Sequence, residues 1–201
     1  MDEDLGDIGA GRTFECPRCS PTVILDLMQG QRVLEHIGAH ILYDPGVIHV
    51  KDILCGLCLR PSPLCQFFLT RGKGANGNLH VNSEMSRGCL VNVNYSYRKA
   101  AESTASSPCS NVPIQCSICA KSKPAIWKYF MKAHFSEKHK NLHPFPKHEH
   151  LWQVSDFELS EMKNIWEKRS KVTAKRTKKT NVPPLLISDT HRAWIPSRYQ
   201  F

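Results

Sequence analysis

Two groups of cysteine and histidine residues in this sequence have the spacing of metal ligands. Each group begins with two cysteines separated by two residues and ends with two histidines separated by three or four: Cys16, Cys19, His36 and His40; Cys116, Cys119, His134 and His139. Structural zinc sites take four thiolate or imidazole ligands in a tetrahedron, and each group supplies two of both. Histidines at this spacing lie near one face of a helix, so both rings can reach one ion. We expect two zinc sites.

Both groups resemble the two-cysteine, two-histidine zinc-finger family. The second cysteine and the first histidine are separated by 16 and 14 residues, whereas about 12 is usual in that family. Apolar residues precede the first cysteine (Phe14, Ile114) and the first histidine (Val33, Met131), as in the family. The resemblance implies two ββα-like fingers whose small cores need metal to persist. The extra residues imply a longer helix or a longer fingertip loop.

The same resemblance implies which positions would face DNA bases. In the first finger they are Gln29, Arg32 and Glu35, all of which can hydrogen-bond base edges. The second finger has side chains there that give no such readout: Trp127, Phe130 and Ala133. The first finger is therefore a candidate reader, and the second is expected to be structural or protein-facing. Polar residues on an exposed helix also occur without base readout, which leaves that alternative open for the first finger.

Five further cysteines suggest a third site in the middle of the chain. Cys55 and Cys58 form a third Cys-x2-Cys pair, a zinc-knuckle half-site, and Cys89 and Cys109 are the expected ligands that complete it. Cys65 lies in a strand-like run with Phe67 and Phe68, which favours a buried core thiol. A redox role for the knuckle would need a thioredoxin-like βαβ context, which this sequence lacks.

The elements that must position these ligands follow from local patterns. Strand-like runs cover 66–70 and 90–95, with a turn over 72–78 between them. Residues 100–107 are small and serine-rich, which predicts a linker. A capping-box pattern at Ser155 and Glu158 starts a predicted helix over 156–168, and its apolar stripe is more typical of packing onto the chain than of partner binding. The stripe comprises Leu159, Met162, Ile165 and Trp166.

The expected fold is a small, zinc-stabilised α+β class, in which two ββα-like fingers flank a β-rich cysteine knuckle. A C-terminal helix and a basic, disordered tail complete it. The sequence divides into an acidic disordered segment (1–13), finger 1 (14–45), the middle segment (46–108), finger 2 (109–143), a loop and helix (144–168) and the tail (169–201). Apart from the two metal motifs there is no internal repeat. The finger linkers are unlike the short ones of tandem DNA-reading arrays, which favours one compact unit over 14–140.

Charge and composition narrow the function classes. The 201-residue chain has a net charge of +9. Residues 1–120 hold 10 basic and 11 acidic residues, whereas residues 121–201 hold 17 and 7. The basic run 168–179 suits nuclear localisation or phosphate contact, unless it is only a solvated tail. Its basic residues are Lys168, Arg169, Lys171, Lys175, Arg176, Lys178 and Lys179.

The start of the sequence bears on the compartment. Met1 is followed by acidic residues without an apolar core, which argues against a secretory signal, and no run of about 18 apolar residues predicts a membrane span. Nine cysteines in such a chain are better explained as metal ligands than as disulfides. We therefore expect an intracellular, nuclear protein.

A second resemblance, to multi-copy Cys/His-rich proteins of mushroom-forming fungi, covers about residues 14–190. It rests on four segments: 36–40 (HIGAH), 55–58 (CGLC), 106–113 (SSPCSNVP) and 161–166 (EMKNIW). It implies a compact multi-zinc module that often lies near mobile elements, and it favours Cys109 as a ligand. It implies no activity.

Two function hypotheses follow. The first is a zinc-binding nuclear protein that binds nucleic acid, with DNA favoured, as a transcription or mobile-element-related factor. The alternative is a zinc-stabilised protein-interaction module that uses the aromatic second finger and the C-terminal helix. An enzyme is not expected, because both four-ligand groups are closed by their own residues and no paired-acid or His-Glu-x-x-His motif is present. We expect no membrane partner and no small-molecule substrate.

Overall fold

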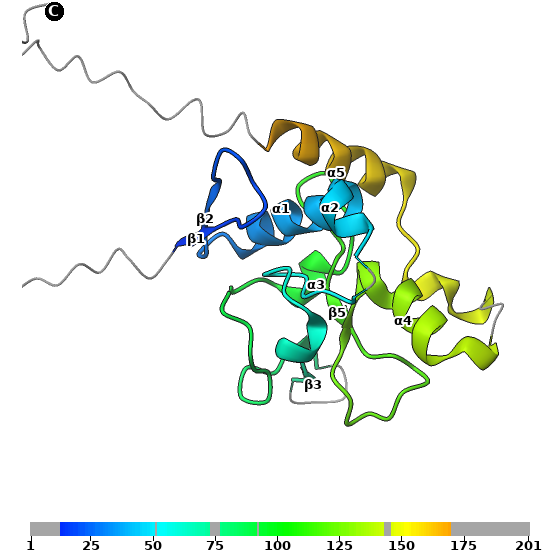
Figure 1. Ribbon diagram of the computed structural model, residues 1–201. Coiled ribbons are helices and arrows are strands. Elements are labelled where there is room, and N and C mark those ends of the chain that lie inside the picture. Colours follow the sequence, from blue (N-terminus) through cyan, green and yellow to red (C-terminus); the bar gives the residue numbers. More distant parts are fainter. Residues whose placement is uncertain (1–12, 51, 73–76, 92, 143–145, 170–201) are drawn as a thin grey trace, which may run out of the picture.

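The computed structural model describes residues 13–50, 52–72, 77–91, 93–142 and 146–169. It is a small α+β fold with three two-stranded antiparallel sheets and several helices (Figure 1). None of the helices in these ranges has the length and apolar character that a membrane crossing needs. The expected α+β class is confirmed at this level. The predicted disorder of residues 1–12 and of 170–201 lies outside the described residues, whereas Thr13 already belongs to a strand.

The first structural unit runs from a short hairpin into a long helix. Strand β1 (Thr13–Glu15) pairs with β2 (Ile24–Asp26) and is followed by α1 (Gly30–Tyr43). Helix α1 ends one residue before Asp44, whose extended backbone is the conformation favoured before a proline. Asp44 then caps α2 (Pro45–Ile48) by accepting a hydrogen bond from the Gly46 amide at 2.9 Å.

Helix α1 is the centre of the hydrophobic core rather than an exposed finger helix. Val33, Leu34, Ile37 and Ala39 have no exposed surface. Helix α5 (Asp156–Lys168) lies across α1 and buries Met162 against it, and the Tyr43 hydroxyl donates to the Leu159 carbonyl at 2.6 Å (Figure 1). The predicted helix over 156–168 is therefore confirmed, and its apolar stripe packs within the chain.

The middle segment is less regular than the sequence predicted. It contains a short 3-10 helix, η1 (Ser62–Leu64), the hairpin of β3 (Leu69–Arg71) with β4 (Leu79–Val81), and α3 (Tyr97–Ala100). The predicted strand over 66–70 begins only at Leu69, and the described residues of 90–95 belong to no strand. Gly72 donates its amide proton to the Asn78 carbonyl at 3.0 Å, in agreement with the predicted turn.

Residues 100–107 do not form the predicted linker. The Ala100 side chain is fully buried as the last residue of α3, and Thr104 pairs with Ser107 in an isolated bridge. The chain meets the core at the two ends of this stretch, through Ala100 and Ser107. The residues between them include four exposed ones: Glu102, Thr104, Ala105 and Ser106. The segment therefore joins its neighbours as folded structure.

The second unit repeats the strand–strand–helix order on a smaller scale. Strand β5 (Pro113–Ile114) pairs with β6 (Ile126–Trp127), followed by 3-10 helix η2 (Lys128–Phe130) and α4 (Met131–Lys138). Two further 3-10 helices are η3 (Lys140–Leu142) and η4 (Pro146–Leu151). Met131 and Phe135 form a small separate core, against which Trp152 packs.

The middle segment and the second unit are joined through Phe67. Its carbonyl accepts the Ala125 amide proton at 2.7 Å, and its ring meets that of Trp127 edge-on with centroids 5.1 Å apart. Trp127 is 2% exposed and belongs to the same core as Leu34 and Met162. The three parts of the chain thus share one main core, as the compact-unit prediction expected.

A buried carboxylate fixes α5 to this core. Ser155 caps α5 by accepting the Glu158 amide proton at 3.1 Å, as the capping-box pattern predicted. The Glu158 carboxylate, however, accepts hydrogen bonds from the Ser110 amide and hydroxyl at 2.7 Å and from the Tyr129 hydroxyl at 2.5 Å. Lys128 donates to the Ser110 hydroxyl at 2.6 Å and so brings a positive charge near this carboxylate. Glu158 is 1% exposed.

Replacing Glu158 should therefore detach α5 at a measurable cost. The substitution Glu158→Ala leaves three donor groups of Ser110 and Tyr129 without their acceptor, so we expect the free energy of unfolding to fall by about 3 kcal/mol. The substitution Glu167→Ala changes an exposed glutamate of the same helix and should cost less than about 0.5 kcal/mol. Denaturant unfolding in excess zinc measures both, and equal losses would refute this role for Glu158.

Candidate metal centres

Three groups of four ligand atoms converge in the structure. Within each group all four sulfur or nitrogen atoms lie within 4.8 Å of one another. Two groups are those expected from the sequence, and the third consists of cysteines alone: Cys16, Cys19, His36 and His40; Cys116, Cys119, His134 and His139; Cys55, Cys58, Cys65 and Cys89. Each group could hold one metal ion.

In the first centre, a hairpin loop faces a helix. Cys16 and Cys19 lie between β1 and β2, and His36 and His40 lie one turn apart on α1. The His40 Nε2 atom is 3.4 Å from the Cys16 sulfur and 3.2 Å from the Cys19 sulfur, and His36 Nε2 is 3.5 Å from the latter. Bond lengths of a tetrahedral zinc ion place sulfur and nitrogen ligands about 3.6 Å apart. The donor separations therefore fit one tetrahedral ion.

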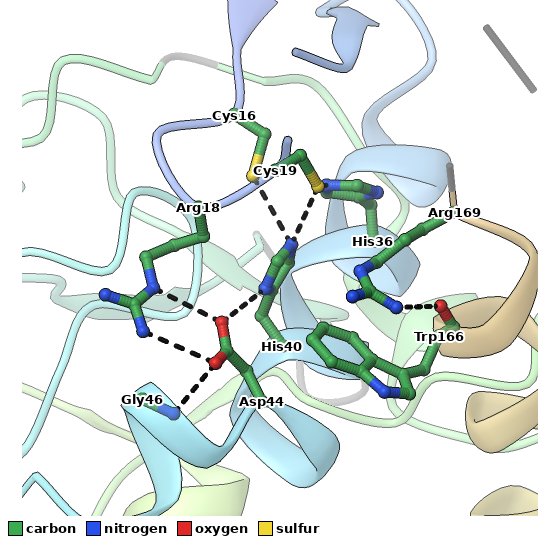
Figure 2. Close-up of polar contacts among 9 residues, drawn as sticks. All are labelled: Cys16, Arg18, Cys19, His36, His40, Asp44, Gly46, Trp166 and Arg169. Atoms are coloured by element: carbon green, nitrogen blue, oxygen red, sulfur yellow. Dashed lines mark hydrogen bonds and ion pairs between the residues drawn. The ribbon is translucent and has the colours of Figure 1, made fainter. Parts of the chain in front are cut away.

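An aspartate outside the four ligands orients His40 (Figure 2). Asp44 Oδ2 lies 2.9 Å from His40 Nδ1, so Nδ1 carries the proton and Nε2 presents its lone pair to the sulfurs. Arg18 donates to both Asp44 oxygens, at 3.2 and 3.3 Å. Burial alone would raise the pKa of Asp44, but hydrogen bonds from Arg18 and His40 lower it below its usual value. The carboxylate thus stays ionised beside the site.

The end of α5 covers the first centre. The Trp166 ring meets the His40 ring edge-on at 5.0 Å between centroids, and the Arg169 guanidinium lies 3.3 Å above the Trp166 ring (Figure 2). Burial, aided by His40 and Arg169, lowers the pKa of His36 to about 4. His36 is therefore neutral near pH 7, the form that binds metal.

The paired thiols of the first centre would need a cation to ionise together. Burial and the neighbouring Cys16 raise the pKa of Cys19 to about 12. The two thiols therefore do not both ionise at neutral pH on their own, and a bound cation would supply the missing stabilisation.

The second centre shows how the longer histidine spacing is accommodated. The Cys119 sulfur lies 3.4 Å from Nε2 of both His134 and His139, and the Cys116 sulfur lies 3.4 Å from His139 Nε2. Helix α4 ends at Lys138, and His139 follows with non-helical backbone angles (φ −124°, ψ 33°). Because the helix ends between the two histidines, the extra residue does not rotate the second ring away from the site.

The third centre consists of four cysteines from three segments. The sulfurs of Cys55 and Cys89 are 3.8 Å apart, and those of Cys58 and Cys65 are 3.5 Å apart, against about 3.8 Å for two thiolates on tetrahedral zinc. The Arg60 guanidinium also donates to the Cys65 sulfur at 3.6 Å. Hydrogen bonding to Cys58 raises the pKa of the Cys55 thiol far above its usual value. These four thiols therefore also need a cation to ionise together.

Cys65, and not Cys109, completes this group. The strand that favoured a core position for Cys65 starts four residues later, and Cys65 follows η1 with its sulfur beside Cys58. Cys109 is fully buried elsewhere, donating to the Leu34 carbonyl at 3.4 Å, with its sulfur 3.6 Å from the Tyr129 hydroxyl. Burial raises its pKa to about 12. Cys109 is thus a protonated core thiol. The short sequence distance between Cys58 and Cys65 was the feature that could have identified Cys65 as the ligand.

Only part of the expected base-reading face of α1 is open to solvent. Glu35 is 4% exposed and lies 3.6 Å from the Arg32 guanidinium, and burial raises its pKa. Gln29 precedes α1 and donates to Asp26 at 3.0 Å. At Gly30 a Cβ atom would come 2.3 Å from the Asn94 carbonyl, so the start of α1 touches the middle segment. Glu35 therefore does not face solvent, which corrects the prediction for that residue. Of the three expected base-reading residues, only Gln29 and Arg32 are exposed.

The other residues whose roles were expected from the sequence also divide into buried and exposed ones. Trp127 is buried and Phe130 packs against the core, whereas Ala133 is exposed. Lys168 is exposed and Arg169 stacks on Trp166. The rest of the basic run lies outside the described residues: Lys171, Lys175, Arg176, Lys178 and Lys179.

No protein-family model, curated protein or solved structure matches this chain. The resemblances drawn from the sequence therefore rest on its motifs and on the three metal groups alone.

Loss of Asp44 should weaken the first centre selectively. The substitution Asp44→Ser keeps a short oxygen that can cap α2 but cannot reach His40 Nδ1. We expect the zinc affinity of the first centre to fall about 10- to 100-fold, the usual effect of losing such a partner. Competition with a chromogenic chelator measures it, and the other two centres of the same protein are the control. Affinity within about twofold of the unaltered protein would contradict this role.

The ligand set of the third centre has a direct test. The substitution Cys65→Ser should remove one bound metal ion per chain, because a serine hydroxyl does not replace a thiolate ligand. The substitution Cys109→Ser should leave the number unchanged. Native mass spectrometry counts the ions. Loss of an ion in the Cys109 variant, with retention in the Cys65 variant, would restore the assignment from the sequence.

Proposed function

We propose that this chain is a zinc protein with three structural sites that binds nucleic acid through phosphate contacts. Two thiolates with two imidazoles, or four thiolates, are the donor sets that zinc takes in structural sites. Each group offers four protein ligands, so no coordination position is left for a substrate or an activated water. This supports a structural use of the metal and a function other than catalysis.

The exposed lysines of the second unit carry this proposal. Six lysines between residues 121 and 147 have exposed side chains: Lys121, Lys123, Lys132, Lys138, Lys140 and Lys147. The same stretch has a single acidic residue, Glu137, which pairs with Lys138 at 2.6 Å. Clustered lysines release counterions when they meet phosphates, and this supplies most of the affinity for nucleic acid that does not depend on sequence.

Sequence readout by the first unit has less support. Helix α1 is buried over most of its length and Glu35 is paired inside, so α1 does not offer a full recognition face. We therefore propose that the chain binds nucleic acid with little base specificity, because α1 does not read a set of bases. The basic run 168–179 supports a nuclear address and would add further phosphate contacts.

The surfaces that a protein-interaction module would use are covered within the chain itself. Trp127 is buried in the chain's own core, and the apolar stripe of α5 faces α1. The exposed lysines favour a polyanion as the partner instead.

Charge reversal on the second unit should distinguish phosphate contacts made by its lysines from the effect of lowering the net charge of the whole chain. The double substitution Lys132→Glu and Lys140→Glu should weaken binding to a mixed-sequence DNA duplex. We expect it to lower the slope of log affinity against log salt by about 2, because two phosphate contacts are lost. The double substitution Arg98→Glu and Lys99→Glu changes two exposed residues of α3 by the same charge and is the control.

Fluorescence anisotropy at several salt concentrations measures both proteins. Equal losses in the two variants would indicate a non-local charge effect, and no binding by the unaltered chain at low salt would refute the proposal.

A further inference from the structure

A cavity of about 700 Å³ lies between the middle segment and the second metal centre. One part of its wall is apolar and consists of Ile53, Pro61, Pro63, Pro124 and Ile126. Another part is the second centre itself, through Cys119, His134 and His139. We call this space the inter-unit cavity. Its volume lies within the range of about 300–1,000 Å³ that small ligands occupy in proteins.

The polar groups of the inter-unit cavity differ in charge. Lys123 and Lys138, which belong to the exposed lysines of the second unit, are part of its lining. Two carboxylates, Asp52 and Glu137, also line it, together with the amide of Gln66. Glu137 and Lys138 pair with each other at 2.6 Å, and their side chains are 51% and 59% exposed. The exposed part of the lining therefore carries charges of both signs.

This combination suits a nucleobase better than a phosphate. Carboxylates repel phosphate oxygens but accept hydrogen bonds from exocyclic amino groups such as N4 of cytosine. Proline and isoleucine side chains offer the apolar surfaces on which a base can lie, and exposed lysines can hold the phosphates on either side of it. A base inside a duplex cannot enter such a space, because it is stacked between its neighbours.

We propose that the inter-unit cavity receives an unpaired base that carries an exocyclic amino group, with cytosine as the reference case. The phosphates flanking this base contact Lys123 and Lys138. This inference rests on the proposed function and names its substrate class as single-stranded nucleic acid. The second metal centre has a part in it, because an ion bound there would hold Cys119, His134 and His139 in place as one wall.

Three oligonucleotide probes test this inference: oligo-dC and oligo-dT of about 12 nucleotides, and a mixed-sequence duplex of the same length. At one salt concentration and slightly alkaline pH, we expect oligo-dC to bind about tenfold more tightly than oligo-dT, because only cytosine has the amino group. We expect the duplex to bind no more tightly than oligo-dT.

Filling the cavity provides the second arm. The substitution Ser62→Trp, at a half-buried position in the lining, should reduce the affinity for oligo-dC to that for oligo-dT. The substitution Asp52→Ala should reduce the ratio of the oligo-dC affinity to the oligo-dT affinity to about one, because a carboxylate acceptor for the amino group is lost. A matched control is Ser83→Trp, which lines a separate cavity of about 540 Å³ beside Tyr95 and Arg87. It should leave all three affinities unchanged, and a metal count confirms that every variant retains its centres.

The outcomes separate the inference from the proposed function. If all three probes bind equally and Ser62→Trp has no effect, the cavity does not receive a base, although the phosphate-binding proposal stands. If Ser83→Trp lowers oligo-dC binding as much as Ser62→Trp does, the inference is also overturned. If no probe binds at low salt, both the proposed function and this inference are wrong.

Discussion

The constraint that most shapes this fold is the convergence of thiol and imidazole groups, whose paired thiols cannot ionise together without a cation. In the three centres the donor atoms approach to between 3.2 and 3.8 Å, and burial raises the pKa of Cys19 to about 12. The strands beside them have two or three residues each, too short to be stable as isolated hairpins. Metal coordination at these groups would supply the stabilisation that such short elements lack.

The first centre and the hydrophobic core share one helix, which makes them interdependent. Helix α1 carries His36 and His40 together with the fully buried Val33, Leu34 and Ile37. Helix α5 covers both, since Met162 packs into the core and Trp166 contacts the His40 ring. A helix used in this way has little free surface for reading bases. The nucleic-acid binding that we propose would then rest on exposed lysines of the second unit, where the core is small and α4 is short.

Residue spacing was enough to predict some features and not others. Two of the three ligand groups follow from Cys-x2-Cys and paired histidines, and the helix over 156–168 follows from its cap and apolar period. Choosing Cys65 over Cys109 depended on where a strand begins, which residue patterns locate poorly. The burial of Glu35 and Glu158 was not predictable, because each is surrounded by residues distant in the sequence: Glu158 by Ser110 and Tyr129, and Glu35 by the core around α1.

The central claim is that three metal ions hold one cooperative structure. The most direct measurement is a zinc titration of the reduced, metal-free chain, in which native mass spectrometry counts bound ions while near-ultraviolet circular dichroism follows the packing of Trp127 and Trp166. The account predicts three zinc ions per chain at saturation, with the aromatic signal absent before metal and complete only when all three are bound. Fewer than three ions, or a full aromatic signal in the metal-free chain, would contradict it.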